Sequence, residues 1–271
     1  MIETIIWVIA FACLIIASLY DLKCRYVPDY ASYSFIMIAV IARLILFFET
    51  NNLLVLTMSI YAGLTVGLFS YAMYKLGSWG GGDVKMIIGT SILIAWLPGE
   101  LIPSFISYLS NILIIGALYT LPITIIIGLK NKCKASKKDK ILMIIGAVSA
   151  AIILTLTGTM IGLLIATTIF LTCSINYLKR VESKCMVKPA NMKTLMDGDW
   201  LVNEIKVGQK IITPKKEGLT KAEAEQIKDW WAKGKLKEKP LIKEGLPFVP
   251  ALLLALIPTI LGVNLIIMLI Q

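Results

Sequence analysis

Long apolar runs separated by short polar segments make up most of the chain. A helix needs about 20 apolar residues to cross the core of a bilayer. Runs of roughly that length lie at 2–20, 30–48, 53–76, 104–129, 140–157, 159–178 and 247–270. One further run, Val84–Leu97, would rise only about 21 Å as a helix, less than the roughly 30 Å of hydrocarbon. We expect it either to reach through Pro98-Gly99-Glu100 or to cross where the bilayer is thinned. The pattern predicts a polytopic α-helical membrane protein with about eight spans.

Composition agrees with this fold class. Of the 271 residues, 58% are hydrophobic, and the mean hydropathy is +0.81, well beyond what a soluble core needs. The first apolar run has no basic leading region and no Ala-x-Ala site, and it ends on Asp21. We therefore expect an uncleaved first span rather than a signal peptide.

The lysines and arginines predict the topology, because short loops rich in them stay in the cytoplasm. If Val84–Leu97 is a span, 26 of the 27 basic residues fall on one side, and only Arg43 lies elsewhere. If it instead turned back, six lysines between residues 130 and 140 would be external. We therefore expect eight spans, with both termini outside and Asp21 and Asp83 at the cytoplasmic face.

The net charge of +10 follows from this topology and from attraction to anionic lipid headgroups, so nucleic-acid binding is not expected. We expect Arg43 to be a snorkelling or hydrogen-bonded residue of the second span; a role in substrate passage is the alternative.

Cysteine and histidine usage narrows the chemistry. The five cysteines have no Cys-x-x-Cys spacing, so neither a zinc site nor a redox pair is expected. We interpret them as packing residues or free thiols: Cys13, Cys24, Cys133, Cys173 and Cys185. Histidine is absent, which excludes Ser-His and Cys-His catalysis. An enzyme with this sequence would use carboxylates, lysines or hydroxyls, and we expect no metal and no cofactor.

A polar segment divides the chain into three parts. We expect a membrane domain at 1–178, a small α+β cytoplasmic subdomain at 179–245 and a last transmembrane helix at 246–271. Within the subdomain, Leu201–Val207 and Lys210–Thr213 flank Gly208, which indicates a hairpin.

A helix follows this hairpin. Thr220 and Glu223 form a Thr-x-x-Glu capping box that starts it, and Gly234 ends it. Its apolar stripe of Ile227, Trp230 and Trp231 is typical of a core face. A docking face for a substrate or partner is the alternative.

Three aspartates, Asp21, Asp29 and Asp83, lie near the cytoplasmic ends of the first three spans. A carboxylate at a membrane helix end is costly, so it indicates a functional site. Two carboxylates that meet share one proton, and such a pair can hydrolyse a peptide bond.

Two other classes of protein remain open. A proton- or cation-coupled transporter predicts acidic groups near mid-membrane and inverted repeats, and neither is found. A non-catalytic assembly scaffold gives no reason for the sequence Gly80-Gly81-Gly82-Asp83.

Gly80, Gly81 and Gly82 suggest how a substrate reaches Asp83. Without side chains, and with access to unusual backbone angles, they would let an extended peptide lie against this loop. The alternative is a flexible turn between helices.

At this point the chain resembles a known family. Gly80-Gly81-Gly82-Asp83, followed by Val84-Lys85-Met86, is similar to the Gly-x-Gly-Asp motif of the membrane aspartic proteases that include presenilin and, more closely, the type IV prepilin peptidases. The stretch from Asp21 to Val27-Pro28-Asp29 resembles the first-aspartate motif of these peptidases. The resemblance implies that Asp21 and Asp83 are catalytic and that the Val-Pro-Asp end is structural.

The carboxy-terminal part narrows the resemblance to archaeal prepilin and preflagellin peptidases. The segments that carry it are Asp197–Trp200, Glu217–Thr220 and Lys243–Ala251. Residues 140–178 have no counterpart and would be an extra hairpin beside a six-span core. Bacterial members often carry paired cysteines and also methylate the new amino terminus. This chain lacks those cysteines and a nucleotide-type glycine loop, so we expect no methyl transfer from S-adenosylmethionine.

The implied substrate is a prepilin or preflagellin with a class III signal, cut between a short basic leader and a hydrophobic helix at the cytoplasmic face. Net charge would not attract such a leader to a basic enzyme, so its recognition must be local. Asp197, Asp199 and Glu204 are candidate leader contacts, against the alternative of a solvated polar face. Lys85 would stabilise the charge of Asp83, hold a substrate carbonyl or anchor the helix end.

Overall fold

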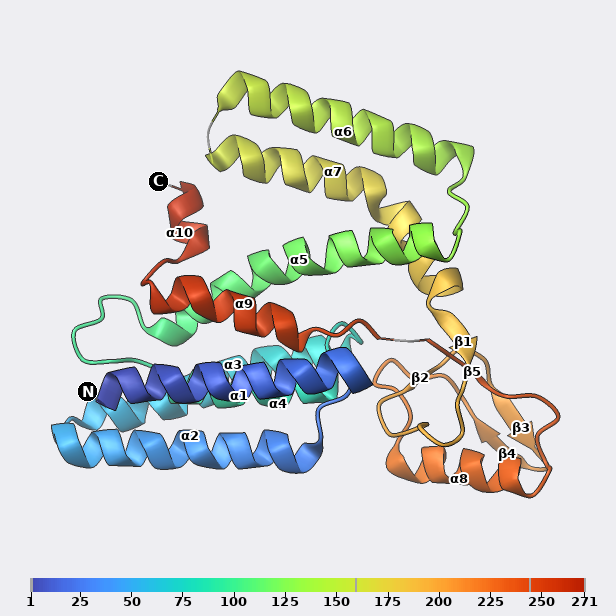
Figure 1. The fold of residues 1–271 in the computed structure, drawn as a ribbon, viewed down its shortest axis with the longest axis horizontal. Helices are drawn as coiled ribbons and strands as arrows, with labels where there is room; N and C mark the ends of the chain where they lie inside the picture. The colour runs from blue at the N-terminus through green and yellow to red at the C-terminus, as the bar shows by residue number, and fades with distance from the viewer. Residues whose placement is uncertain (1, 159, 244, 271) are drawn as a thin grey trace.

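The computed structural model describes residues 2–158, 160–243 and 245–270. Long helices lie side by side in a bundle, and a small part with strands and one helix lies at one end of it (Figure 1). The bundle helices are α1 (Ile2–Cys24), α2 (Asp29–Thr50), α3 (Leu53–Lys75), α4 (Gly81–Leu93), α5 (Ser104–Lys130), α6 (Lys137–Thr157), α7 (Met160–Arg180), α9 (Val249–Ile260) and α10 (Leu265–Ile270). Among the described residues, α1, α2, α3, α5 and α6 are long and apolar enough to cross a membrane. The predicted fold class, a polytopic helical membrane protein, is confirmed.

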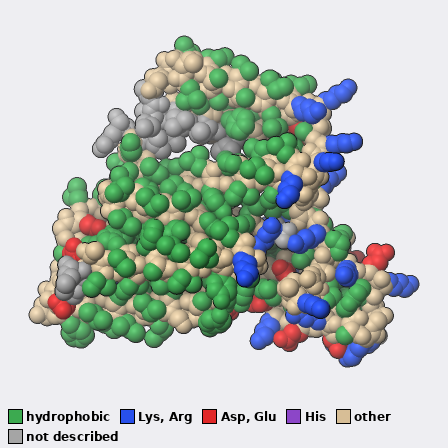
Figure 2. Space-filling model, in the orientation of Figure 1, with side chains coloured by type: hydrophobic (Ala, Val, Ile, Leu, Met, Phe, Trp, Pro, Cys, Tyr) green, Lys and Arg blue, Asp and Glu red, His purple; other side chains and the backbone are tan. Residues whose placement is uncertain are grey.

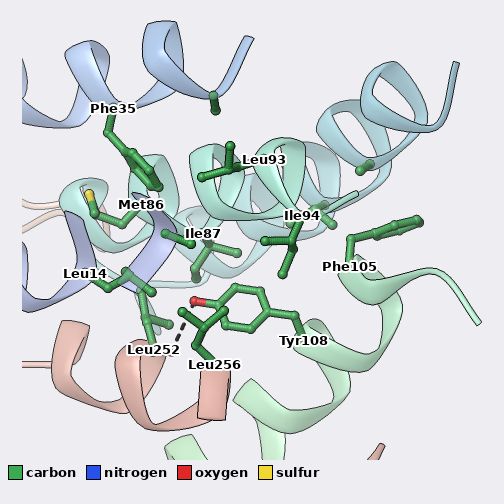
Figure 3. Packing of buried hydrophobic residues seen from close by; sticks show 14 of the residues in the cluster. Leu14, Phe35, Met86, Ile87, Leu93, Ile94, Phe105, Tyr108, Leu252 and Leu256 are labelled. Atoms are coloured by element: carbon green, nitrogen blue, oxygen red, sulfur yellow. Dashed lines mark hydrogen bonds between the residues drawn. The ribbon is translucent and has the colours of Figure 1, made fainter. Parts of the chain in front are cut away.

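Helix α4 lies at the centre of the bundle core. It packs mainly against α2 and α3 and also contacts α1, α5 and α9. Its side chains Met86, Ile87 and Leu93 are buried, and Figure 3 shows residues of α1, α2, α5 and α9 around them. The Tyr108 hydroxyl in this core donates a hydrogen bond to the Leu252 carbonyl of α9 at 3.2 Å. The surroundings of α4 are therefore largely protein.

The predicted apolar run Val84–Leu97 is helical only as far as Leu93. The chain continues as irregular backbone through Glu100, whose carboxylate accepts hydrogen bonds from the Leu97 and Ser104 amides, each at 3.1 Å. Such backbone is tolerated in a membrane protein where the protein itself satisfies its polar groups. The sequence placed the apolar run correctly but overestimated the helix.

Arg43 supports the same irregular segment from α2. Its side chain is 1% exposed and donates hydrogen bonds to the Trp96 carbonyl at 2.7 Å, to the Val55 carbonyl at 3.0 Å and to Ser59 Oγ at 2.7 Å. The prediction of a hydrogen-bonded residue is confirmed. Arg43 joins α2 to α3 and to the chain that follows α4.

The expectation of one continuous last span at 247–270 is wrong. Helix α9 ends at Ile260, and the chain turns through Gly262, whose φ of +69° suits a residue without a side chain. Asn111 of α5 supplies hydrogen bonds to the backbone at this break. Its side-chain amide donates to the Val263 carbonyl, and its Oδ1 accepts from the Leu265 amide, both at 2.9 Å. The two short helices α9 and α10 result.

The part at the end of the bundle, here called the insert, has its own hydrophobic core. The short π-helix η1 (Val181–Cys185) leads into it from α7. Its elements are β1 (Val187–Pro189), β2 (Trp200–Leu201), β3 (Ile205–Val207), β4 (Lys210–Ile212), α8 (Lys221–Ala232) and β5 (Leu241–Lys243). Strand β5 pairs antiparallel with β1 and β2, and β3 pairs antiparallel with β4.

Local signals in the insert predicted these elements well. The hairpin around Gly208 forms, although Leu201 lies in β2 rather than in the hairpin. Thr220 and Glu223 form the capping box of α8. Ile227 and Trp230 are buried in the insert core, which confirms the core interpretation of that stripe.

Two cysteines are paired, contrary to the expectation of free thiols. A disulfide joins Cys133, between α5 and α6, to Cys185 of η1. The two residues are 52 positions apart, and they meet because η1 packs against α5. Cys13, Cys24 and Cys173 are free.

Basic side chains mark one end of the molecule. Figure 2 shows Lys and Arg at the end of the bundle beside the insert and on the insert, while hydrophobic side chains cover the long sides of the helices. The face shown in Figure 2 thus has the segregation of charge predicted from the loops.

Candidate active site

A cavity of about 930 Å³ lies where the bundle meets the insert. It is lined by Asp21, by the run Gly80–Asp83 and by insert residues that include Asp197 and Asp199. The structure thus brings together both aspartate motifs, which lie 62 positions apart in the sequence. The insert segment with Asp197 and Asp199, more than 100 residues further along the chain, forms another wall of the cavity.

Asp21 occupies the last turn of α1 and is 5% exposed. Its Oδ2 accepts a hydrogen bond from the Val249 amide at 2.9 Å, at the first residue of α9. The amides in the first turn of a helix have no partners within it, so a carboxylate there satisfies a donor and complements the helix dipole. Asp21 therefore caps a helix that is 228 positions away in the sequence.

Asp83 stands in the first turn of α4. Its Oδ2 accepts a hydrogen bond from the Gly80 amide at 2.9 Å, so it caps its own helix. The carboxylates of Asp21 and Asp83 interact electrostatically. Two helix starts thus hold the two carboxylates at one cavity.

The two motifs are in direct contact at their ends. A side chain built at Gly82 would place Cβ 3.4 Å from Cβ of Val27. Lys85 Nζ lies 2.5 Å from Oδ1 of Asp29 and 4.8 Å from the centre of the Tyr33 ring. The described partner of Lys85 is therefore Asp29 rather than Asp83, and this ion pair ties the start of α2 to α4.

The glycines do not adopt the unusual backbone angles that we expected. Gly80 has a φ of −76°, and neither Gly81 nor Gly82 has a positive φ. What Gly80 provides is space: a Cβ there would lie 3.1 Å from Oδ2 of Asp83, tighter than most real contacts. A small residue lets the carboxylate fold back onto the helix start.

The segment before α9 contacts both motifs, and sequence reasoning did not identify it as part of the site. The Val249 amide holds Asp21, and the Phe248 ring lies 5.9 Å from the ring of Trp79, the residue just before Gly80. A Cβ at Gly116 of α5 would come within 2.9 Å of the Phe248 ring. Pro250, a residue common in the first turn of a helix, was the available signal for a helix start here.

The insert is fastened to the end of α3 beside the cavity. Lys75 Nζ lies 2.7 Å from Glu217 Oε1, and the Tyr74 hydroxyl donates to the Glu217 carbonyl at 3.4 Å. Gly77, with a φ of +73°, allows the close passage of Lys216, whose carbonyl oxygen would lie 2.9 Å from a Cβ at that glycine. These contacts hold the insert against the end of α3, beside the cavity.

The three candidate leader contacts differ in position. Asp197 and Asp199 line the cavity. Glu204 does not line the cavity and lies 2.9 Å from Lys206 in an exposed ion pair, so the cavity does not support its prediction as a leader contact. Asp199 Oδ2 accepts the Met196 amide at 2.9 Å, and burial raises the pKa of this carboxyl.

This arrangement has the parts that acid-base chemistry on a peptide needs. Two carboxylates face one cavity, and such a pair can share one proton, so that one member acts as base and the other as acid. The cavity volume of about 930 Å³ lies at the upper end of the roughly 300–1,000 Å³ found for ligand sites. Gly80 to Gly82 leave one side of the cavity free of side chains.

Comparison with known proteins supports the resemblance. Residues 8–130, which contain both aspartate motifs, match the family model of the type IV leader peptidases. A preflagellin peptidase of Methanocaldococcus jannaschii is 32% identical over 153 residues, which are 49% of this chain and 62% of that protein. The match therefore spans less than two thirds of that relative's length. No solved structure matches the chain significantly.

Proposed function

We propose that this chain, whose residues 8–130 match the family model of the type IV leader peptidases, is a membrane-embedded aspartic endopeptidase of that family. It removes the short basic leader of a prepilin or preflagellin. The observation that supports this most is the single cavity that both Asp21 and Asp83 line. The printed name of the similar archaeal protein, a preflagellin peptidase, supports the substrate class.

In this proposal the two aspartates divide the chemistry. The ionised member takes a proton from a water molecule as the water oxygen bonds to the scissile carbonyl carbon, while the protonated member donates its proton to the carbonyl oxygen. When the tetrahedral intermediate collapses, the C–N bond breaks, the aspartate that took the water proton donates it to the leaving amine, and the other aspartate takes a hydroxyl proton back as the carboxyl group forms. The electrostatic interaction of Asp21 with Asp83 suits a pair that shares one proton.

The other motif residues position substrate and catalyst. The substrate backbone lies along Gly80, Gly81 and Gly82, where no side chain obstructs it. Lys85 and Asp29 join the two motifs through their ion pair and perform no proton transfer. The reaction uses no cofactor or metal.

The site faces the cytoplasm in this proposal. The basic side chains at the insert end of the bundle (Figure 2) are the side that positive-inside loops occupy. Residues 1–178 then form the membrane domain with the dyad, 179–245 the cytoplasmic subdomain and 246–271 the return into the membrane. The substrate's hydrophobic helix lies in the bilayer, so its leader junction lies at the depth of the dyad.

Reconstitution tests this function. The protein in liposomes is mixed with a prepilin or preflagellin, and leader release is measured by gel shift and by mass spectrometry of the new amino terminus. Wild type should cut at the junction between leader and helix, Asp21→Asn and Asp83→Asn should each reduce cutting to a small residual rate, and Asp29→Asn should cut at the wild-type rate. Cutting that survives both catalytic substitutions would end the aspartyl mechanism.

A further inference from the structure

We infer that Asp197 is a specificity-determining residue that binds a basic side chain of the leader. This inference rests on the proposed peptidase function and deepens it. Asp197 belongs to the insert, yet it lines the same cavity as Asp21 and Asp83. Its carboxylate interacts electrostatically with Tyr74, whose ring would lie 3.8 Å from a Cβ at Gly81. If the substrate backbone lies extended along Gly80–Gly82, its leader passes Tyr74 and reaches Asp197.

The loop that carries Asp197 is fixed in place. The Gly198 amide donates to the Leu219 carbonyl, and the Leu219 amide donates to the Asp199 carbonyl, both at 2.8 Å. Gly198 has a φ of +86°, and a Cβ at Gly218 would lie 2.4 Å from the Gly198 oxygen, so the absence of a side chain at Gly218 lets the two turns pack closely. The position of Asp197 is therefore determined by backbone packing and does not depend on its own side chain.

The net charge of the residues that line the cavity is opposite in sign to the net charge of the whole protein. The chain has 27 basic and 17 acidic residues, but the cavity lining has seven acidic and five basic ones. The acidic ones are Asp21, Asp29, Asp83, Glu182, Asp197, Asp199 and Glu217. A local excess of carboxylates is what a basic peptide requires from a protein with a positive net charge.

Most of these carboxylates are already engaged. Asp29, Glu182 and Glu217 each form an ion pair with a lysine. Asp21, Asp83 and Asp199 accept hydrogen bonds from backbone amides. Asp197 is exposed to solvent, and among the described residues it makes no ion pair. It is the carboxylate on this wall that an incoming lysine or arginine meets first.

The test is a charge exchange between enzyme and substrate. Wild type, Asp197→Asn and Asp197→Lys are assayed in liposomes on a substrate with a basic leader and on one whose leader lysines are replaced by glutamate. For Asp197→Asn on the basic leader we expect KM to rise about two- to fivefold, as for loss of an ion pair at an exposed carboxylate, with kcat nearly unchanged. Asp197→Lys should cut the acidic leader better than the basic one, which reverses the wild-type preference. Glu204→Gln is the matched control, being an acidic residue of the same insert outside the cavity, and should behave as wild type.

The outcomes separate this inference from the proposed function. If Asp197→Asn cuts both leaders with the wild-type KM, or if Asp197→Lys keeps the wild-type preference, Asp197 does not read the leader while the peptidase assignment stands. If Asp197→Lys cuts neither leader although its circular dichroism and melting match wild type, the residue has another role and the inference fails. If wild type itself cuts neither leader, the proposed function falls and the inference with it.

Discussion

Asp21 caps helix α9, and this makes a prediction about stability that is separate from catalysis. Its buried carboxylate accepts the Val249 amide at 2.9 Å and is also hydrogen-bonded to the Phe248 backbone. Asp21→Ala leaves these buried amides without a partner. A lost helix cap costs about 0.5–2 kcal/mol, and a lost hydrogen bond to a charged group about 1.5–3 kcal/mol. We expect Asp21→Ala to lower the free energy of unfolding by about 2 kcal/mol.

Asp21→Asn should behave differently, since asparagine caps helices about as well as aspartate. Its loss of stability should stay below about 1 kcal/mol, although the substitution removes the carboxylate to which we assign the proposed catalytic role. The control is Asp29→Ala, which breaks an ion pair whose Asp29 side chain is 53% exposed and should cost only about 0.2–1 kcal/mol. Unfolding is followed by circular dichroism in mixed micelles with increasing SDS. If Asp21→Ala unfolds at the same SDS fraction as Asp29→Ala and wild type, the cap does not support α9 as described.

Three further predictions concern residues other than the two aspartates of the dyad. Arg43→Met removes the donor of the part-buried hydrogen bond to the Trp96 carbonyl and of the buried one to the Val55 carbonyl, so it should lower the free energy of unfolding by about 3 kcal/mol. Unfolding at the same SDS fraction as wild type would contradict this. Burial raises the pKa of Asp199, so the stability that its protonated carboxyl contributes is complete below the unfolded pKa of about 3.9 and is lost as pH rises through the folded pKa. Asp199→Asn should flatten this dependence of the melting temperature on pH, measured by tryptophan fluorescence. An unchanged slope would exclude Asp199 as its source. Cys133 and Cys185 should resist labelling by maleimide until a reductant is added. Because the disulfide joins residues 52 positions apart, reducing it should lower the free energy of unfolding by about 4 kcal/mol on the chain-entropy account. Labelling of both cysteines without reductant would exclude the disulfide.

The sequence predicted what depends on neighbouring residues. Thr220 and Glu223 are three positions apart, so their capping box could be recognised before the fold was known. Gly208 predicted its hairpin for the same reason. The apolar runs predicted the helices because each helix must match the bilayer largely by its own length and composition.

The rest depends on contacts between distant segments, and no local pattern specifies those. Val249 binds Asp21 from 228 positions away, and Cys185 pairs with Cys133 across 52 positions. The break after α9 is stabilised by hydrogen bonds to Asn111 on α5, which the sequence does not reveal, so a largely apolar run was interpreted as one span. In the candidate site, Asp21 and Asp83 were identified from their motifs, whereas Phe248 and the cavity wall at Asp197 required the structure.

The measurement that tests the central proposal most directly is a double-mutant cycle on the dyad. Leader release by liposome-reconstituted wild type, Asp21→Asn, Asp83→Asn and the double variant is followed under single-turnover conditions. Residues that act as one catalytic unit have strongly non-additive effects on rate. We therefore predict that the double variant is no slower than either single variant. Independent losses, whose logarithms add in the double variant, would contradict the claim that Asp21 and Asp83 work as a pair.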